Sequence, residues 1–102
     1  MIMRVTWGKI RPGKWDEYER LWNEHARETA GTPGLQGRWL LRDSDTNDAG
    51  YSMSLWDSAA DFEAYAASGA QKNAPQMIEC FVGQYVTTAC EVRGAEFAGL
   101  KG

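Results

Sequence analysis

The sequence is poor in histidine and cysteine, and it contains no long apolar run. One His and two Cys among 102 residues do not have the spacing of a zinc site, so we expect no metal and no other cofactor. No apolar stretch approaches the roughly 20 residues that a membrane-spanning helix needs. The first residues also lack the apolar core of a signal peptide. We therefore expect a cytoplasmic protein with no membrane partner.

The sequence also has no excess of positive charge. Eleven Lys and Arg are outnumbered by 14 Asp and Glu, which gives a formal net charge of −3. The basic residues are scattered among acidic ones and form no stripe that could follow a phosphate backbone. Nucleic acid is therefore not an expected partner.

The two cysteines are predicted to be buried free thiols. Cys80 and Cys90 lie ten residues apart in a stretch that is typical of one strand. At ~3.3 Å per residue they would be about 33 Å apart, whereas a disulfide needs Cα atoms within roughly 7 Å. No run of basic residues lies nearby to lower the pKa of either thiol, so a nucleophilic role is not expected.

Two strand-then-helix units organise the chain into the order βαββαβ. Residues rich in β-branched and aromatic types predict strands, and apolar residues at i, i+3, i+4 and i+7 predict the first helix. Ser58-Ala-Ala-Asp61 is typical of a capped helix start. The predicted elements are a strand at 2–11, a helix at 14–29, strands at 35–42 and 51–56, a helix from 58 to before 69, and a strand at 81–92. A short extra helix over Lys72–Ile78, interrupted by Pro75, and a C-terminal tail at 93–102 complete the pattern.

The segment 43–50 between two predicted strands has the composition of a turn. Asp43, Asp45 and Asn47 are spaced like the first ligands of a calcium loop. However, Asp48 occupies the sixth position, where glycine is needed, and Ser54 occupies the twelfth, where a bidentate Glu belongs. We therefore expect a solvated hairpin loop.

The predicted strands carry bulky apolar residues on both of their faces. In 35–42, Trp39 and Leu41 alternate with Leu40, and in 51–56 Met53 opposes Trp56. Two helices can cover only one face of a four-stranded sheet, so the other face needs a cover from outside the chain. A second copy is the simplest cover, and we expect a homodimer that pairs sheet against sheet.

Three short motifs resemble the antibiotic biosynthesis monooxygenase family of the dimeric α/β-barrel, ferredoxin-like superfamily. The motifs are Arg11-Pro-Gly13, the stretch from Pro33 to Asp43 (PGLQGRWLLRD), and Leu55-Trp-Asp-Ser58 followed by Phe62 and Tyr65. The resemblance covers roughly residues 3 to 90. It implies a ferredoxin-like domain at 1–92: a four-stranded antiparallel sheet with two helices on one face. It further implies pairing into a dimeric barrel and a small-molecule pocket between sheet and helices.

Known members of this family oxidise anthrones or quinols with dioxygen, using neither flavin nor metal, and others degrade heme. The heme-degrading members carry an Asn in the first strand, a Trp in the second helix and an iron-ligating His beyond it. Alignment on the shared motifs places Thr6, Tyr65 and Pro75 at those positions. Heme degradation is therefore not expected.

His25 is the candidate catalytic base. A cofactor-free oxygenase must deprotonate its substrate near neutral pH, and the ordinary histidine pKa of about 6.5 suits that task. His25 follows Tyr18, Leu21 and Trp22 on the apolar stripe of the first helix, so it is expected to face the sheet. A partly exposed or capping position is the alternative.

The candidate substrate-binding residues are Thr6, Trp22, Arg38, Tyr65 and Gln84. Aromatic walls for a planar ligand would come from Trp22 and Tyr65 together with Trp7 and Trp39, although each could instead belong to the core. Arg38 could hold a phenolate, or it could lie exposed at the rim of the sheet.

The first hypothesis is a homodimeric, cofactor-independent monooxygenase that acts on a small planar aromatic, quinol- or anthrone-like, with dioxygen. A dimeric barrel that binds a small ligand without turnover is the first alternative. A lyase or isomerase of the same superfamily is the second alternative, and it would need proton transfer alone. Fold by itself does not choose among these three.

Overall fold

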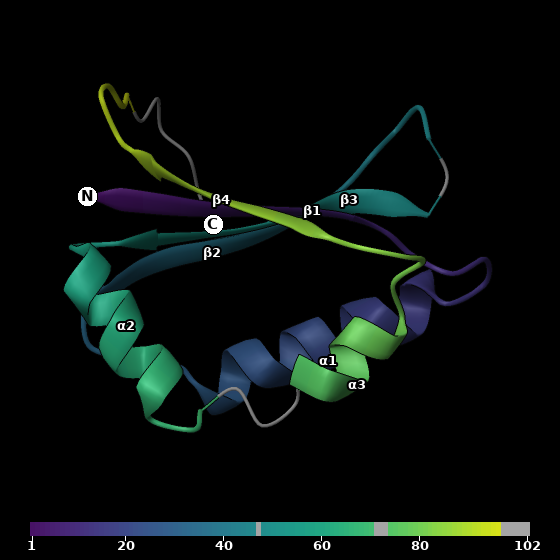
Figure 1. Ribbon diagram of the computed structural model, residues 1–102, viewed down its shortest axis with the longest axis horizontal. Helices are drawn as coiled ribbons and strands as arrows, with labels where there is room; N and C mark the ends of the chain where they lie inside the picture. Colours follow the sequence, from purple (N-terminus) through teal and green to yellow (C-terminus); the bar gives the residue numbers. More distant parts are fainter. Residues whose placement is uncertain (47, 71–73, 97–102) are drawn as a thin grey trace.

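The computed structural model describes residues 1–46, 48–70 and 74–96 and contains seven elements (Figure 1). They are β1 (Ile2–Lys9), α1 (Trp15–Glu28), β2 (Leu35–Arg42), β3 (Ala49–Trp56), α2 (Ala59–Ala67), α3 (Ala74–Glu79) and β4 (Val86–Glu91). The four strands form one antiparallel sheet in the order β2-β3-β1-β4. The predicted ferredoxin-like βαββαβ fold is confirmed. None of the described helices is long and apolar enough to cross a membrane.

All three helices lie on one face of the sheet and leave the other face open (Figure 1). The helix-facing residues are the even-numbered ones in β1, and their cross-strand partners share that face. One row runs from Arg38 through Ser54 to Arg4, and the next runs from Leu40 through Ser52 and Thr6 to Thr87. These two rows form the floor beneath the helices.

The apolar stripe of α1 packs on this floor as its periodicity predicts. Trp15, Tyr18 and Leu21 are buried, and they join Ile10 and Phe81 in the core cluster. Tyr18 contacts Phe81 edge-on, with ring centroids 5.3 Å apart. The acidic residues in the first turn of α1 suit the positive end of its dipole. This stripe therefore anchors α1 to the end of the sheet where β1 finishes.

Two glycines on neighbouring strands let aromatic rings lie directly on the sheet. Gly8 pairs with Gly50 across β1 and β3. A Cβ on Gly8 would overlap the Phe81 ring, and a Cβ on Gly50 would overlap the Leu41 carbonyl oxygen and approach the Trp15 ring. The absence of a side chain at these two positions therefore lets the rings close the core at this end of the sheet.

The start of α2 is capped as predicted. Ser58 Oγ accepts a hydrogen bond from the Asp61 backbone N–H at 3.2 Å, and it donates to the Asp61 carboxylate at 2.8 Å. Trp56, just before the cap, packs against Phe62 and Tyr65 with centroid distances of 5.5 and 5.3 Å. This aromatic cluster attaches α2 to the opposite end of the sheet from Phe81.

The predicted final strand at 81–92 is wrong in its first half. Phe81 makes only an isolated bridge to Ile10, and β4 begins at Val86. Gly83, with a φ of 69°, turns the chain between them. Cys80 is buried before this turn, but Cys90 is exposed on β4, so the prediction of two buried thiols holds only for Cys80. Both are free.

The predicted extra helix is present as α3, but Pro75 does not interrupt it. Pro75 is its second residue, where a missing N–H costs no helical hydrogen bond. Lys72 of that prediction, Asn47 of the calcium-like spacing and residues 97–102 of the tail lie outside the described residues.

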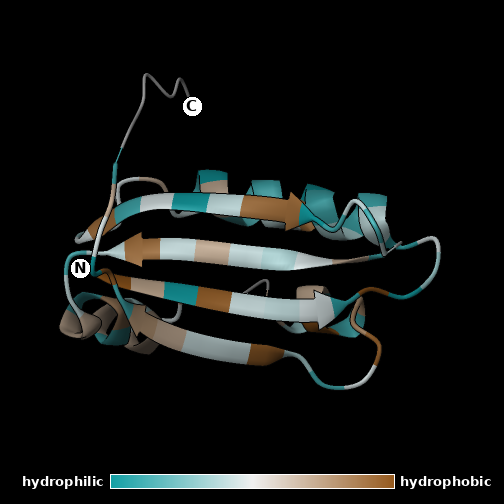
Figure 2. Cartoon of the chain, turned by 90° about the horizontal axis from the view of Figure 1, so that it is seen from above, coloured by the Kyte–Doolittle hydropathy of each residue, from teal (hydrophilic) through white to brown (hydrophobic). Residues whose placement is uncertain are grey.

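The open face of the sheet carries an apolar row that crosses all four strands, and Figure 2 looks onto this face. The row runs through register partners: Leu41, Tyr51, Trp7 and Val86. Their exposed fractions are 44%, 40%, 38% and 56% in that order. We call these four residues the open-face row. The predicted bulk on both faces of the sheet is therefore confirmed.

We expect Gly8→Ala to destabilise the fold by about 1–3 kcal/mol, because the new methyl group must displace the Phe81 ring from a packed core. Urea unfolding of both proteins measures the difference. Gly94→Ala is the control, since its Cβ would meet no atom within 4 Å. Equal midpoints for Gly8→Ala and wild type would contradict this account of the core.

Candidate functional site

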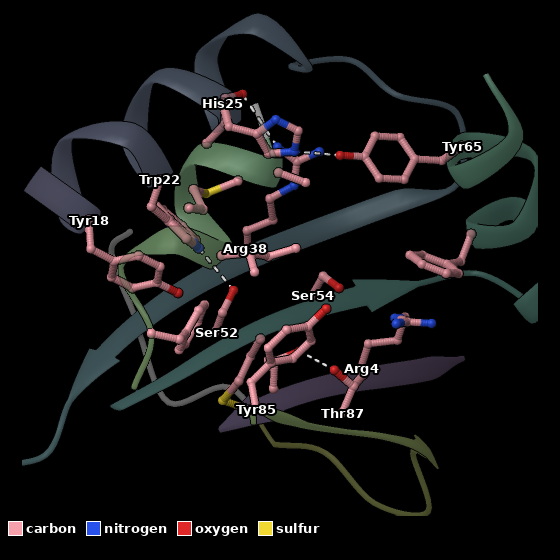
Figure 3. A pocket seen from close by; sticks show the side chains of 18 of the residues that line it. Arg4, Tyr18, Trp22, His25, Arg38, Ser52, Ser54, Tyr65, Tyr85 and Thr87 are labelled. Atoms are coloured by element: carbon pink, nitrogen blue, oxygen red, sulfur yellow. Dashed lines mark hydrogen bonds between the residues drawn. The ribbon is translucent and has the colours of Figure 1, made fainter. Parts of the chain in front are cut away.

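A cavity of about 320 Å³ lies between the sheet and the helices, inside the roughly 300–1,000 Å³ range of small-molecule sites (Figure 3). It extends from Phe81 at one end of the sheet to the aromatic cluster of Trp56, Phe62 and Tyr65 beneath α2 at the other. Its wall is mostly aromatic and aliphatic, with a few hydroxyl groups, one His and two Arg. The lining residues are Arg4, Thr6, Tyr18, Trp22, His25, Ala26, Arg38, Ser52, Met53, Ser54, Trp56, Phe62, Tyr65, Ala74, Met77, Ile78, Phe81, Tyr85 and Thr87.

His25 of α1 and Tyr65 of α2 form a hydrogen bond across the gap between the two helices. His25 Nε2 lies 2.5 Å from Tyr65 Oη, and the dashed line in Figure 3 marks this contact. The other ring nitrogen, Nδ1, is buried with no hydrogen-bond partner among the described residues. A molecule bound in the cavity can therefore exchange a proton with the His25 imidazole through the Tyr65 hydroxyl group.

Arg38 enters the same part of the cavity from β2. Its Nη1 donates to Thr29 Oγ1 at 2.6 Å and weakly to the Ala26 carbonyl at 3.5 Å, which fixes the guanidinium against the end of α1. Its Nη2 is buried and has no hydrogen-bond partner among the described residues. The guanidinium carbon lies 5.8 Å from the centre of the Tyr65 ring. The Nη2 amino group of Arg38 is thus available to donate a hydrogen bond to a bound molecule.

The surroundings of His25 keep it neutral at physiological pH. Burial lowers the pKa of His25 below its ordinary 6.5, and the positive charge of Arg38 lowers it further; Glu28 opposes this shift. The imidazole therefore loses its proton at a lower pH than a solvated histidine does. A neutral imidazole can accept a proton, which is the state a general base requires.

Two further hydrogen bonds fix the floor and one wall. The Trp22 indole N–H donates to Ser52 Oγ at 2.9 Å, which holds the ring against the floor of the cavity. The hydroxyl groups of Thr6 and Thr87 are 2.9 Å apart across β1 and β4. Burial, together with a smaller electrostatic effect of Cys80, raises the pKa of Tyr18 to about 12, so this phenol stays protonated. The wall beside Trp22 is therefore uncharged.

The structure brings together five of the six predicted site residues. Thr6, Trp22, His25, Arg38 and Tyr65 all line the cavity. Gln84 is exposed in the turn before β4 and does not line it.

Of the four aromatic residues suggested as cavity walls, Trp22 and Tyr65 line the cavity. Trp7 and Trp39 do not line the cavity, because both have the strand parity of the open face.

Sequence reasoning missed several lining residues, above all Arg4, Ser54, Trp56 and Phe62. Strand alternation could have found Arg4, since it lies two residues before Thr6 and shares its face. Ser54 would have followed by the same rule from Trp56. No signal in the sequence pairs β1 with β3 in this register, so the row itself was not predictable.

No cluster of three or more His, Cys, Asp and Glu side chains that could hold a metal ion occurs within 1–46, 48–70 and 74–96. The chemistry available from these residues is proton transfer at the His25–Tyr65 pair and stabilisation of negative charge at the guanidinium groups. The aromatic walls suit a flat ligand.

Comparison with known proteins agrees with this architecture. Residues 1–76 match the model of the family described as antibiotic biosynthesis monooxygenase. No curated protein matches the chain.

Solved structures with this fold include SnoaB, a cofactor-independent oxygenase from Streptomyces nogalater. It is 18% identical, with 92% of this chain and 94% of that chain covered and a TM-score of 0.80. A protein from Caulobacter crescentus named for the same family is 19% identical, covering 91% and 90%, with a TM-score of 0.82. A conserved protein from Methanosarcina mazei is 16% identical, covering 87% and 89%, with a TM-score of 0.80. At these identities the likeness shows a shared fold.

The single histidine gives an isolated NMR signal with which to test the site. We expect His25 to titrate below 6.5, because burial and Arg38 both disfavour its protonated form. In Arg38→Gln the pKa should rise toward 6.5. Arg42→Gln removes the same charge from the same strand outside the cavity and should leave the titration unchanged. A wild-type pKa at or above 6.5 would contradict the described surroundings of His25.

Proposed function

Because the chain belongs to the antibiotic biosynthesis monooxygenase family, we propose that it is a cofactor-independent monooxygenase. Its substrate would be a small planar aromatic compound, quinol- or anthrone-like, that reacts with dioxygen. The observation that carries the proposal is the hydrogen bond between His25 and Tyr65 at the edge of an aromatic cavity. The structural similarity to SnoaB, a cofactor-independent oxygenase, supports the absence of a cofactor in this proposal.

The first step is removal of a hydroxyl proton from the substrate. The substrate donates to Tyr65 Oη while the Tyr65 hydroxyl donates to His25 Nε2, so the proton moves through the phenol to the imidazole. His25 can take it because its lowered pKa keeps it unprotonated beforehand. Tyr65 thus acts as a relay, and His25 acts as the base.

The second requirement is stabilisation of the resulting anion. The unpartnered Nη2 of Arg38 can donate to the substrate oxygen, and hydrogen bonds to a charged group are roughly twice as strong as neutral ones. Thr29 and Ala26 hold Arg38 before the substrate arrives. Such a preorganised donor costs little reorganisation when charge develops.

The oxidation itself is then chemistry of the substrate anion. The anion passes one electron to dioxygen, and the radical and superoxide combine into a peroxide on carbon, which takes back the proton held by His25 and becomes a hydroperoxide. The O–O bond then breaks, one oxygen stays on the substrate as a carbonyl, and the other leaves as water with the two hydrogens lost from the substrate. The protein contributes the base, the donor and a water-poor pocket.

We also propose that the protein is a homodimer through the open face of its sheet. The open-face row crosses all four strands with 38–56% of each side chain exposed. A contiguous apolar surface of this kind marks an association site. A second copy provides an identical apolar row, and antiparallel sheets pack face to face at about 10 Å.

The oxygenase proposal predicts dioxygen uptake by metal-stripped, flavin-free protein with hydroquinones, naphthoquinols or dithranol, above the autoxidation rate. His25→Ala should lower the rate by about 100-fold or more, and Tyr65→Phe by about 10- to 100-fold, because each removes part of the proton relay. Oxygen-electrode measurements give these rates directly.

Arg20→Gln, on the exposed side of α1, is the control and should keep the wild-type rate. Ligand binding without any uptake would overturn the proposal in favour of a binding barrel. Turnover of an aromatic substrate that persists without dioxygen would instead indicate a lyase or isomerase.

The dimer proposal predicts a sedimentation mass of about twice the 11.4 kDa chain. Leu41→Glu should yield monomers, since it places a charge within the open-face row, where a second copy would bury it. Ala64→Glu introduces the same residue on the exposed side of α2 and should remain dimeric. A wild-type protein that sediments as a monomer at micromolar concentration would refute this assembly.

A further inference from the structure

The cavity contains a second arginine that the proposed reaction does not use. Arg4 of β1 points into the cavity beneath α2, with its guanidinium carbon 3.5 Å from the centre of the Phe62 ring (Figure 3). No carboxylate is paired with it among the described residues, and its side chain is half-buried. Burial without an anion is unfavourable for a guanidinium, because it gives up water for a ring face alone.

The cavity as a whole is positively charged in an otherwise acidic protein. The chain has a formal net charge of −3, yet none of the described lining residues is Asp or Glu. Arg4 and Arg38 both line it, while the lowered pKa of His25 leaves that residue neutral. A phenolate bound at Arg38 would balance one of these charges and leave Arg4 unbalanced.

Ser54 lies between the two arginines in the sheet register. It is the cross-strand partner of Arg4 on one side and of Arg38 on the other. At ~4.8 Å between strands, the two arginine backbones are about 10 Å apart, which leaves space above the small serine. Ser54 Oγ accepts a hydrogen bond from the Trp56 indole at 2.9 Å, which orients the hydroxyl and leaves its own hydrogen available to donate.

We propose that Arg4 and Ser54 form an anion subsite, and that the substrate is a hydroxylated aromatic carboxylic acid. Its carboxylate accepts hydrogen bonds from the Arg4 guanidinium and the Ser54 hydroxyl. Its reacting hydroxyl group faces Tyr65 and Arg38. This inference rests on the proposed function for the identity of the reacting group, but the carboxylate subsite can be measured by binding alone.

The test compares two ligands that differ in one charge and carry the hydroxyl at the far end of the ring system, 6-hydroxy-2-naphthoate and 6-hydroxy-2-naphthamide, by calorimetric titration of the wild-type protein. Neither ligand needs to be oxidised for binding to be measured. We expect the acid to bind about 10-fold or more tightly than the amide, since a charge-assisted hydrogen bond to a carboxylate is lost in the amide. Equal affinities would overturn the subsite without any variant having to fold.

Variants test which residues cause the higher affinity for the acid than for the amide. Arg4→Gln should remove the preference for the acid, and Ser54→Ala should reduce it several-fold. Arg42→Gln, which removes one positive charge outside the cavity, should keep the wild-type preference. A preference that survives in folded Arg4→Gln would refute the assignment to Arg4.

The two proposals fail separately. An Arg4-dependent preference without dioxygen uptake on any quinol or anthrone would refute the oxygenase and keep the anion subsite. Dioxygen uptake with equal affinity for acid and amide would keep the oxygenase and refute the subsite.

Discussion

The site depends on the contact between two aromatic rings and two glycines at one end of the sheet. Gly8 and Gly50 let Phe81 and Trp15 lie directly on the strands. At the other end, the Trp56 cluster fills the space beneath α2 with bulky rings. The helices are thus held close at one end and apart at the other, and the cavity is the gap between these two packing arrangements.

Small side chains in β3 keep that gap open. Ser52 and Ser54 occupy floor positions where larger residues would fill the cavity, and both use their hydroxyl groups to bind indole N–H groups, from Trp22 and Trp56. Each indole is therefore satisfied and held at the wall. The polar groups of the floor serve first to position the aromatic walls, and this explains how an apolar pocket contains so many hydroxyl groups.

Local signals in the sequence predicted the elements well, and tertiary arrangement accounts for the errors. The cap at Ser58 and the stripe of α1 depend on neighbours within a few residues, so both were predictable. Alternation gave the two faces of each strand but could not say which face the helices cover, so Trp7 was considered as a possible cavity wall although it lies on the open face. Alternation from Thr6 could have placed Arg4 on the cavity face, but its pairing with Ser54 depends on a register with β3 that no short-range pattern encodes.

Because side chains alternate strictly along β1, its eight residues contribute to two different surfaces. Even-numbered residues face the cavity side of the sheet and affect ligand binding, whereas odd-numbered residues lie on the open face and affect association. A substitution can therefore change one surface while the other stays intact, so ligand choice and association can evolve independently. A one-residue shift in the register of the whole strand would exchange the two faces: Trp7 would turn inward and Arg4 outward. Length variation should accordingly be confined to the turns, while the strands diverge by substitution alone.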